Sequence, residues 1–419
     1  MRIIFVNRFF HPDQSATSRM VSGLAFALAK RGSRVAVLAS RHPHDRPDVI
    51  LPPLESIGGV EIHRLAGSGF GRRTLLGRAA DYATFHLAAA KWLTMNARAD
   101  DICIVCTDPP LLSVSVALPL AIKGVTMVNW VMDMFPEVAT ELGMLAPGSM
   151  TARLATSLRD WSYRRAALTV CPIERMAGFL EGRGLQRERL SVLHHWSDGD
   201  EIFPVAPNQN RLREEWGLSG KFVVGYSGNF GRAHEFDTLL DAADILRGDG
   251  AIRFLLIGDG KKRGYVEDEV RRRQLTNVLM KPLQPKAMLA ESLCASDLHL
   301  VSLLPQLEHC VVPSKLYGIL AAGRPVCFVG DKAGEVATVI GQGGCGTAVE
   351  VGQSRGLADT IRAYRDDPRR HAVACHAARQ LFEVRYTRDR GLADWCETID
   401  SIVSSRRPRG IVDYYEGTT

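Results

Sequence analysis

Short apolar segments that alternate with helical segments, twice along the chain, most constrain the fold of this sequence. Residues 3–6 are an apolar run of strand length, residues 20–28 carry apolar side chains at helical spacing, and residues 35–38 are a second apolar run. A helix between two strands joins them in parallel, because a parallel connection must cross the sheet. The spacing therefore predicts an α/β fold.

A second cycle of the same kind begins after the polar stretch 204–213. Strands are expected at residues 222–226, 254–257 and 298–302, with helical segments between them. At 419 residues, the chain is long enough for two separate cores. We therefore predict two doubly wound, Rossmann-like α/β domains facing a cleft, with boundaries at 1–204 and 205–385 and a helical tail, 386–419, that packs across the domains.

Composition excludes several classes of protein. Hydrophobic residues make up 46% and charged residues 23%, which is typical of a soluble globular chain. A net charge of +6, spread along the chain, does not indicate a nucleic-acid partner. Nine cysteines without regular spacing favour reduced thiols and a cytoplasmic protein. The longest apolar stretch, 109–122, falls short of the roughly 20 residues that a membrane-spanning helix needs.

The segment 312–326, VPSKLYGILAAGRPV, resembles the donor-binding segment of sugar-nucleotide glycosyltransferases of the GT-B fold. The resemblance is greatest to the retaining family 4 branch that builds surface polysaccharides, the colanic-acid and O-antigen amino-sugar transferases. Further segments similar to this family stand in the family's order at 9–12, 133–137, 194–198, 226–232 and 258–260.

This resemblance implies the roles of the two domains. The C-terminal domain would bind a nucleotide sugar, UDP-linked and in this branch an N-acetylated amino sugar. The N-terminal domain would present the acceptor, a polyprenyl-linked or other saccharide. Retention of anomeric configuration, with no metal and no cofactor, is likewise what the resemblance implies.

Two strand-to-helix junctions of the second domain suit a diphosphate on physical grounds. The glycine-containing turn at 228–231 would point backbone amides at an anion, with Arg232 adding charge. Ser314 and Lys315, after Pro313, offer a hydroxyl and an ammonium at the next helix start. A plain turn, and a capping serine beside a surface lysine, remain the alternatives.

The donor site expected from the resemblance combines these junctions with neighbouring loops. Arg232 and Lys315 are predicted to act in catalysis. The predicted donor-binding residues are Gly228, Asn229, Gly231, Gly258, Gly260, Leu283, Glu308, Pro313, Ser314 and Glu335. The family's pair of glutamates is broken here, because Glu308 supplies the first while the second falls on Leu316 or Gly318. Glu335 could bind a hydroxyl or only cap its helix.

The acceptor side is predicted where the first domain's strands end. Asp133 and Glu137 follow a strand expected to face the cleft, and they are predicted to act in catalysis together with His11. Turn formation and a first-turn helix charge are the alternatives for the two carboxylates. The remaining predicted acceptor-binding residues are Gln14, Ser15 and His86, the last of which could equally be a packed helical histidine.

Three motifs are rejected. Cys103-x-x-Cys106 has no second pair and lies along a strand, so a structural role outweighs metal binding. The two carboxylates of 198–200 sit at an expected interdomain turn, and residues 67–71 lack the spacing of a dinucleotide fingerprint. We predict no metal site.

A peripheral position on the inner face of a membrane is also predicted. Basic and apolar residues mix between positions 64 and 91, which suits anionic headgroups, although a solvated helix face is the alternative. The residues are Arg64, Arg72, Arg73, Arg78 and Lys91, with Phe70, Leu75, Leu76, Tyr82 and Phe85. Glycosyl transfer is the leading function; a sugar-nucleotide epimerase and a degenerate transferase acting as an assembly partner are the alternatives.

Overall fold

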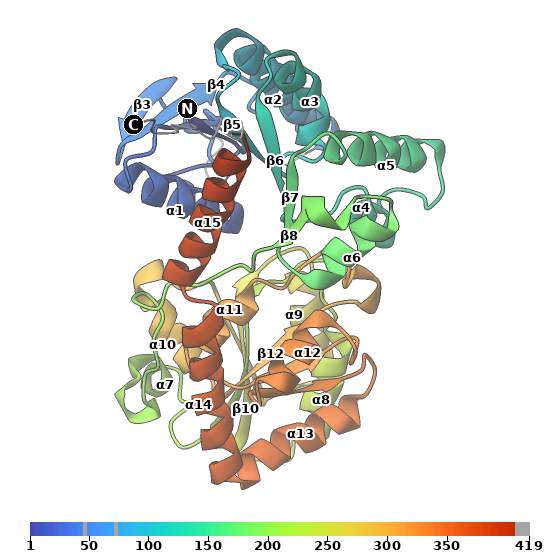
Figure 1. Cartoon of the computed structure of the whole chain (residues 1–419). Helices are drawn as coiled ribbons and strands as arrows, with labels where there is room; N and C mark the ends of the chain where they lie inside the picture. Colours follow the sequence, from blue (N-terminus) through green and yellow to red (C-terminus); the bar gives the residue numbers. More distant parts are fainter. Residues whose placement is uncertain (45–47, 71–73, 407–419) are drawn as a thin grey trace, which may run out of the picture.

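The computed structural model describes residues 1–44, 48–70 and 74–406, which form two α/β domains (Figure 1). The sheet of the N-terminal domain has the order β3-β4-β2-β1-β5-β6-β7-β8 within the described residues. Its strands are β1 (Ile3–Val6), β2 (Val35–Ser40), β3 (Leu54–Ile57), β4 (Val60–Leu65), β5 (Ile102–Cys106), β6 (Thr126–Trp130), β7 (Leu168–Cys171) and β8 (Leu190–Val192).

β1 is central in this sheet, where Ile3 pairs with Val35 of β2 on one side and with Ile102 of β5 on the other. Every residue of β1 and β5 is buried, because helices cover both faces of a parallel sheet. The pairs are parallel except β3 with β4, an antiparallel hairpin at the edge that the apolar pattern did not predict.

The second sheet has the order β11-β10-β9-β12-β13-β14, and its pairs are parallel. The two sheets, parallel except for the edge strand β3, confirm the predicted pair of Rossmann-like domains. Strand β9 extends three residues past the predicted end at residue 226, because Gly228 and Asn229 continue its pairing with β10. The strands are β9 (Phe222–Asn229), β10 (Ile252–Asp259), β11 (Val278–Lys281), β12 (Leu298–Ser302), β13 (Val326–Val329) and β14 (Gly346–Val349).

Helices cover both faces of the first sheet. Ile3 and Phe5 pack in one apolar cluster with α1, whereas Ile4 and Val6 pack in another with α2 and α3, as the alternation along a strand requires. The helices of this domain are α1 (Ala16–Lys30), α2 (Leu75–Asn96), α3 (Leu112–Ile122), α4 (Glu137–Glu141), α5 (Met150–Tyr163), α6 (Glu174–Gly182) and the 3₁₀ turn η1 (Arg187–Arg189).

In the second domain, the core between the sheet and helices α8 and α13 contains Tyr226 and Phe254. The helical elements here are η2 (Pro207–Gln209), α7 (Arg211–Glu215), α8 (Asp237–Ile245), α9 (Arg263–Arg272), η3 (Lys286–Met288), α10 (Leu289–Cys294), η4 (Pro305–Leu307), α11 (Lys315–Ala321), α12 (Glu335–Gln342), α13 (Ser354–Asp366) and α14 (Pro368–Arg385).

The last helix, α15 (Arg388–Arg406), runs back from the C-terminal to the N-terminal domain (Figure 1). Thr387, just before it, forms an isolated bridge with Ser197. Trp395 then packs among the apolar residues around β1, with its ring centroid 4.4 Å from that of Trp130. The chain thus crosses between the domains twice, before β9 and again at α15.

The carboxyl ends of the two sheets face each other across the domain boundary. The backbone N–H of Met134, just after β6, donates to the carbonyl of Cys310 at 2.9 Å. Arg175 of α6 contacts Asp331, just after β13, at 3.2 Å. The rings of Phe179 and His309 stack with centroids 4.6 Å apart. The loop after β6 and the helix after β7 therefore contact loops that follow strands of the second sheet.

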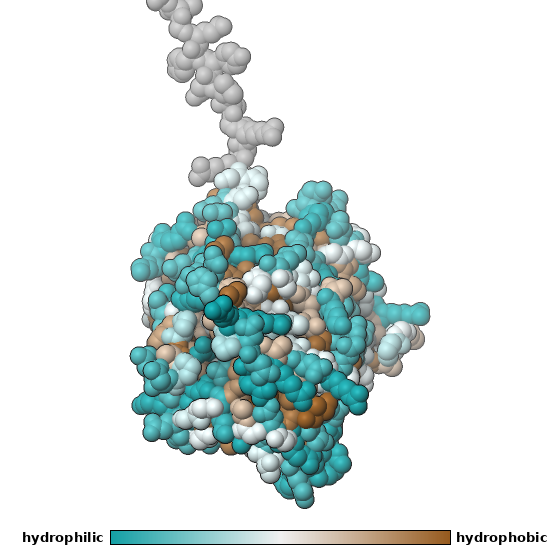
Figure 2. Space-filling view, turned by 90° about the horizontal axis from the view of Figure 1, so that it is seen from below, coloured by the Kyte–Doolittle hydropathy of each residue, from teal (hydrophilic) through white to brown (hydrophobic). Residues whose placement is uncertain are grey.

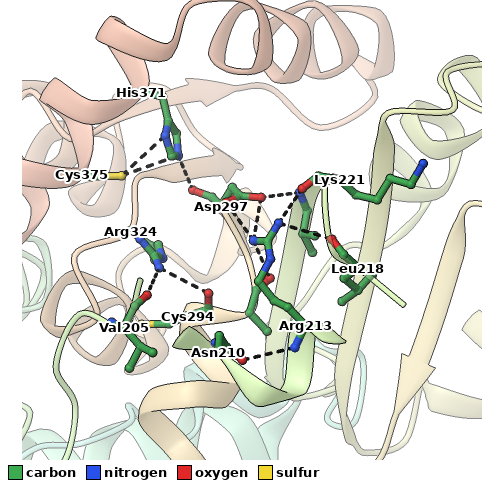
Figure 3. Close-up of polar contacts among 12 residues, drawn as sticks. Val205, Asn210, Arg213, Leu218, Lys221, Cys294, Asp297, Arg324, His371 and Cys375 are labelled. Atoms are coloured by element: carbon green, nitrogen blue, oxygen red, sulfur yellow. Dashed lines mark hydrogen bonds and ion pairs between the residues drawn. The ribbon is translucent and has the colours of Figure 1, made fainter. Parts of the chain in front are cut away.

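A buried polar network holds the opposite end of the second sheet (Figure 3). Arg213 pairs with Asp297 at 2.9 Å, and the Asp297 carboxylate also accepts from the backbone N–H of Val223 at 2.7 Å. Arg324 donates to the carbonyl of Val205 at 2.7 Å, which fixes the interdomain linker. His371 of α14 donates to the Asp297 carbonyl, so the network joins the linker, the sheet and α14.

Removing the carboxylate of Asp297 should destabilise the C-terminal domain. The substitution Asp297→Ala leaves the Arg213 guanidinium buried without its counter-charge, and such losses cost about 3–5 kcal/mol. Urea unfolding followed by circular dichroism measures the change in unfolding free energy. The control is Asp268→Ala, which removes an exposed pair with Arg271 on α9 and should leave the unfolding curve almost unchanged. Equal effects of the two substitutions would contradict the assigned role.

Candidate functional site

Loops after four neighbouring strands of the second sheet, β10, β9, β12 and β13, lie together at the domain boundary. Ligands of open α/β sheets bind at this edge. The residues predicted to bind the donor are distributed over these loops, with the exception of Leu283. Leu283 is exposed in the loop after β11, at the same edge of the sheet and beyond β10.

The glycines of this edge are required by the packing of the loops on each other. A Cβ on Gly258 would lie 1.8 Å from the carbonyl oxygen of Gly228, and a Cβ on Gly260 would lie 2.4 Å from Oδ1 of Asn229. A Cβ on Gly231 would lie 2.9 Å from Nδ2 of the same asparagine. Contact with a ligand is therefore not needed to explain these glycines, and their donor-binding role stays a prediction.

Lys315, at the start of α11, has a buried ammonium. Its Nζ has no hydrogen-bond partner among the described residues and lies 3.7 Å from the centroid of the Tyr226 ring. Burial lowers the pKa of Lys315 to about 7. The alternative of a surface lysine beside a helix cap is therefore wrong. Pro313 is buried and Ser314 exposed just before it, and Ser314 makes no capping hydrogen bond.

His234 lies beside this ammonium and is uncharged. Its Nδ1 donates to the Ser302 carbonyl at 2.6 Å, which leaves Nε2 as an acceptor. Burial, and next the charge of Lys315, lower the pKa of His234 to about 3. Arg232, two residues earlier, is exposed and makes no ion pair within the part of the chain that the structure describes. Lys262 holds this loop by donating to the His234 carbonyl at 2.7 Å.

Glu308 and Glu335 meet at the start of α12. The backbone N–H of Glu335 donates to Oε2 of Glu308 at 3.1 Å, while Oε1 is buried without a partner among the described residues. Burial raises the pKa of Glu308 to about 7, and burial also raises the pKa of Glu335. A Cβ on Gly334 would lie 2.5 Å from the Glu308 carboxyl group, so that glycine makes room for it.

On the N-terminal side, Asp133 follows β6 and is exposed at the boundary. The protein around it, and then the nearby charge of Asp108, raise the pKa of Asp133 to about 6. Thr107 Oγ1 accepts from the backbone N–H of Met132 at 3.1 Å, which fixes this loop against the end of β5. The hydrogen bond from Met134 to Cys310 then places Asp133 next to the segment that joins Glu308 to Lys315.

Glu137 does not offer a free carboxylate. Arg159 of α5 donates to both of its oxygens, at 2.7 and 3.0 Å, and both side chains are almost fully buried. Arg159 also pairs with Asp160 at 2.7 Å. This geometry favours a positioning role for Glu137, which holds α4 and the loop of Asp133 against α5.

The other predicted acceptor-side residues differ in their surroundings. The His11 carbonyl accepts from Arg64 at 2.6 Å, and the His11 ring lies edge-on to Phe26. Gln14 is exposed, and Ser15 has a buried hydroxyl without a partner among the described residues. The two ring nitrogens of His86 form hydrogen bonds with Ser115 Oγ and the Pro110 carbonyl, at 2.8 and 3.2 Å. These contacts favour the alternative of a packed helical histidine.

The surface predicted for a membrane between residues 64 and 91 does not form as expected. Arg64 is buried and forms an ion pair with Glu55. Phe85 lies on the inner side of α2 and is buried in the core between this helix and the sheet. Tyr82 is half-buried and covered by Arg8. Phe70, Leu76 and Lys91 are exposed and Arg78 is half-buried. Arg72, Arg73 and the side chain of Leu75 lie outside the described residues.

Within residues 1–44, 48–70 and 74–406, no group of three His, Cys, Asp or Glu side chains is arranged to hold a metal ion. Cys103 and Cys106 are buried in β5, and burial raises the pKa of both thiols. Asp198 pairs with Arg388 at the second crossing between the domains.

Sequence reasoning missed the side chains that give this site its electrostatic character. Tyr226 was only part of a motif, yet its ring contacts the Lys315 ammonium. Arg159 belongs to no motif in the sequence, although it binds Glu137 from 22 positions along the chain. Nothing in the local sequence pattern distinguishes these residues from ordinary core and helix positions.

Two family descriptions match the chain. Residues 15–196 match the glycosyl transferase 4-like domain, and residues 221–367 match the glycosyl transferases group 1. The probable glycosyltransferase WbjE of Pseudomonas aeruginosa is 28% identical over 82% of this chain and 84% of its own length. The putative colanic acid biosynthesis glycosyl transferase WcaI of Escherichia coli K12 is 29% identical over 48% of this chain and 50% of its own length.

A solved structure shares the fold. Anabaena Alr3699/HepE, in complex with UDP and glucose, superimposes with a TM-score of 0.72 at 18% identity, over 96% of this chain and all of the other.

The unpartnered ammonium should make binding of an anion depend on pH. Lys315 is charged below about pH 7 and neutral above it. Affinity for a diphosphate, tested with UDP as the probe, should therefore fall as pH rises from 6 to 8.5. Binding near pH 8 should also take up protons, because the diphosphate raises the pKa of Lys315. Isothermal titration in buffers of different ionisation enthalpy measures this uptake. In Lys315→Met the uptake should disappear; an unchanged uptake would assign it to another group, such as Glu308.

Proposed function

Since the chain belongs to the glycosyltransferases of the GT-B fold, with a glycosyl transferase 4-like domain followed by a group 1 domain, we propose that it transfers a sugar from a UDP-sugar to a lipid-linked or oligosaccharide acceptor, with retention of configuration. The observation that carries the proposal is the buried, unpartnered ammonium of Lys315 beside the Asp133 loop of the other domain. The names of WbjE and WcaI, and the UDP and glucose bound by HepE, support it.

The donor half of the reaction needs positive charge where the bond breaks. Cleavage of the bond between the anomeric carbon and the diphosphate leaves its electron pair, and growing negative charge, on the leaving oxygen. Lys315 and Arg232 would bind the diphosphate and stabilise this charge more in the transition state than in the bound donor. Because Lys315 has no carboxylate partner among the described residues, its charge is available to the phosphate.

Hydrogen-bond acceptors at the same edge would orient the donor. The unpartnered Oε1 of Glu308 would accept a hydrogen bond from a sugar or ribose hydroxyl, and Nε2 of His234 offers a second acceptor. Leu283, in the loop after β11, would contact the base. We propose this set in place of the family's broken glutamate pair.

The acceptor half would use Asp133. The acceptor hydroxyl would attack the anomeric carbon on the same face from which the diphosphate departs, as retention in one displacement requires. Its proton would pass to the Asp133 carboxylate, which is ionised above about pH 6, and the diphosphate would leave with the electron pair of the broken bond. Glu137 and Arg159 would hold the loop that carries Asp133. His11, Gln14 and Ser15 would contact the acceptor from the end of β1.

The test of the function uses the purified full chain with radiolabelled UDP- and GDP-sugars, with and without a lipid extract and oligosaccharide acceptors. Label that moves into an acceptor supports the proposal. A changed sugar without acceptor would instead indicate an epimerase. Binding of a donor without either reaction would indicate a non-catalytic partner.

Loss of either cation at the diphosphate should slow turnover. Removing one donor to a developing negative charge costs about 2.7–4 kcal/mol, so Lys315→Ala and Arg232→Ala should each lower kcat about 10²- to 10³-fold. Steady-state transfer at saturating donor measures the effect. Lys221→Ala, at the opposite end of the sheet, is the control. Near-normal turnover of either variant would remove that residue from the site, and Lys261 and Lys262 would be examined instead.

Loss of the carboxylate on the acceptor side should remove the acidic limb of the pH profile. In the wild type, kcat should fall below about pH 6 as Asp133 takes up a proton. Asp133→Asn should lower kcat about 10²- to 10⁴-fold and abolish that limb, while the affinity for UDP stays unchanged. A profile that keeps its acidic limb would contradict the role of Asp133 as the proton acceptor.

A further inference from the structure

We propose that Tyr226 is a positioning residue of the anion site, because its ring holds the ammonium of Lys315 against the turn at 228–231. For the identity of the anion, a diphosphate, the proposal rests on the proposed function. Its evidence is the packing of strand β9, the turn that follows this strand, and the start of α11.

The ammonium of Lys315 lies on the face of an aromatic ring. Figure 2, which views the molecule from the end of the C-terminal domain away from the site, shows a mostly hydrophilic surface on which charged side chains are solvated. The Nζ of Lys315 is instead buried, has no hydrogen-bond partner among the described residues, and lies 3.7 Å from the centroid of the Tyr226 ring. At this distance the negative face of the ring attracts the cation.

Three contacts fix the position of this ring. The hydroxyl of Tyr226 donates to the carbonyl of Asn229 at 2.7 Å. The rings of Phe230 and Phe236 lie edge-on to the tyrosine, with centroids 5.1 and 5.0 Å away, and they stack on each other. Because these contacts set where the ring lies, they also set where a cation on its face lies.

The same tyrosine connects the two junctions that are predicted to bind the diphosphate. Its hydroxyl bonds to the turn after β9, and its ring contacts the first residue of α11. A Cβ on Gly228 would lie 3.6 Å from Cε and 3.8 Å from Nζ of Lys315, so the lysine side chain lies directly against this turn. The ammonium and the backbone of the turn therefore form one surface, with Tyr226 in contact with both.

An aromatic ring suits this position better than a carboxylate would. A carboxylate would neutralise the ammonium and compete with the phosphate oxygens, whereas a ring attracts the cation without supplying a counter-charge. A lysine without any such contact would sample many rotamers, because its stem is flexible. Tyr226 thus keeps the cation in place and leaves its charge available to an anion.

Several titratable groups surround this ammonium. Burial, with a smaller contribution from the charge of Lys315, lowers the pKa of His234 to about 3 and that of His299, on β12, to about 4. Both histidines are therefore neutral near pH 7. The other charged side chains on the surrounding loops are Arg232, Glu235, Asp259, Lys262 and Glu308. Burial raises the pKa of Glu308 to about 7, so its titration has to be separated from that of Lys315.

The test follows the titration of Lys315 by NMR in the full chain, labelled with carbon-13 at the lysine ε carbons. Lys315→Met identifies the resonance, which should titrate near pH 7, apart from solvated lysines. Tyr226→Phe keeps the ring and should move the midpoint by less than about 0.3 pH unit. Trifluorophenylalanine at position 226 keeps the shape but withdraws charge from the ring face, so the midpoint should fall by about 0.5 to 1.5.

The matched control is trifluorophenylalanine in place of Phe254, which lies in the same core on β10 and should leave the midpoint unchanged. Repeating the titration in Glu308→Gln separates the two groups, and the fall caused at position 226 should persist there. Equal midpoints for all rings at position 226, an equal fall in the Phe254 control, or a fall that vanishes in Glu308→Gln would overturn the proposal.

Binding of UDP, as the diphosphate probe, tests the link to the function. At pH 8 Lys315 takes up a proton to bind the probe, so trifluorophenylalanine at position 226 should weaken binding about three- to thirtyfold. In the Lys315→Met background the same change should have no effect, and an equal weakening there would contradict the role of Tyr226.

Failure of this proposal is distinguishable from failure of the proposed function, because the NMR midpoints are measured without any substrate. If the midpoints fall as expected while Lys315→Met binds UDP as tightly as the wild type, Tyr226 holds the ammonium and the role of Lys315 in donor binding is wrong.

Discussion

Val131 and Met134, at the carboxyl end of β6, belong to the same buried apolar cluster as Leu307 and Cys310 of the C-terminal domain. Because this cluster is continuous, the two sheets cannot shift past each other without exposing apolar surface or opening packing defects. The hydrogen bond from Met134 to Cys310 fixes the register of the contact. Asp133 is thereby held beside the segment from Glu308 to Lys315, so the proposed site depends on this packing rather than on any single loop.

The site differs from the far end of the second sheet in how its charges are satisfied. At that far end, the buried guanidinium of Arg213 is paired with the carboxylate of Asp297. At the domain boundary the ammonium of Lys315 and one oxygen of Glu308 are buried without hydrogen-bond partners among the described residues. Unpaired buried charge costs stability, and the shifts of both pKa values toward 7 express that cost. A phosphate and a hydroxyl would remove it, which is why these two groups indicate a ligand.

The polar contacts around the linker and the C-terminal crossing complete the arrangement. Arg324 holds Val205 at the start of the second domain, and Trp395 fixes α15 in the core of the first. The domains are therefore connected at two places, the linker before β9 and helix α15.

The amino-acid sequence by itself determined the two parallel sheets, because strand and helix periodicities are local properties that need no tertiary contact to be read. The pattern also predicted a strand-to-helix junction at Lys315, and the resemblance of residues 312–326 to a known family predicted that this junction binds the donor. It could not reveal that Lys315 lies over Tyr226, 89 residues away in number but adjacent in space. Nor could it show that Glu137 is bound by Arg159, that Arg64 is buried against Glu55, or that one side of apolar α3 is exposed. These features depend on which elements the fold brings together, because burial and pairing are set by distant parts of the chain. Only the tertiary structure decided which charges are paired, which are left for a ligand, and which apolar face remains uncovered.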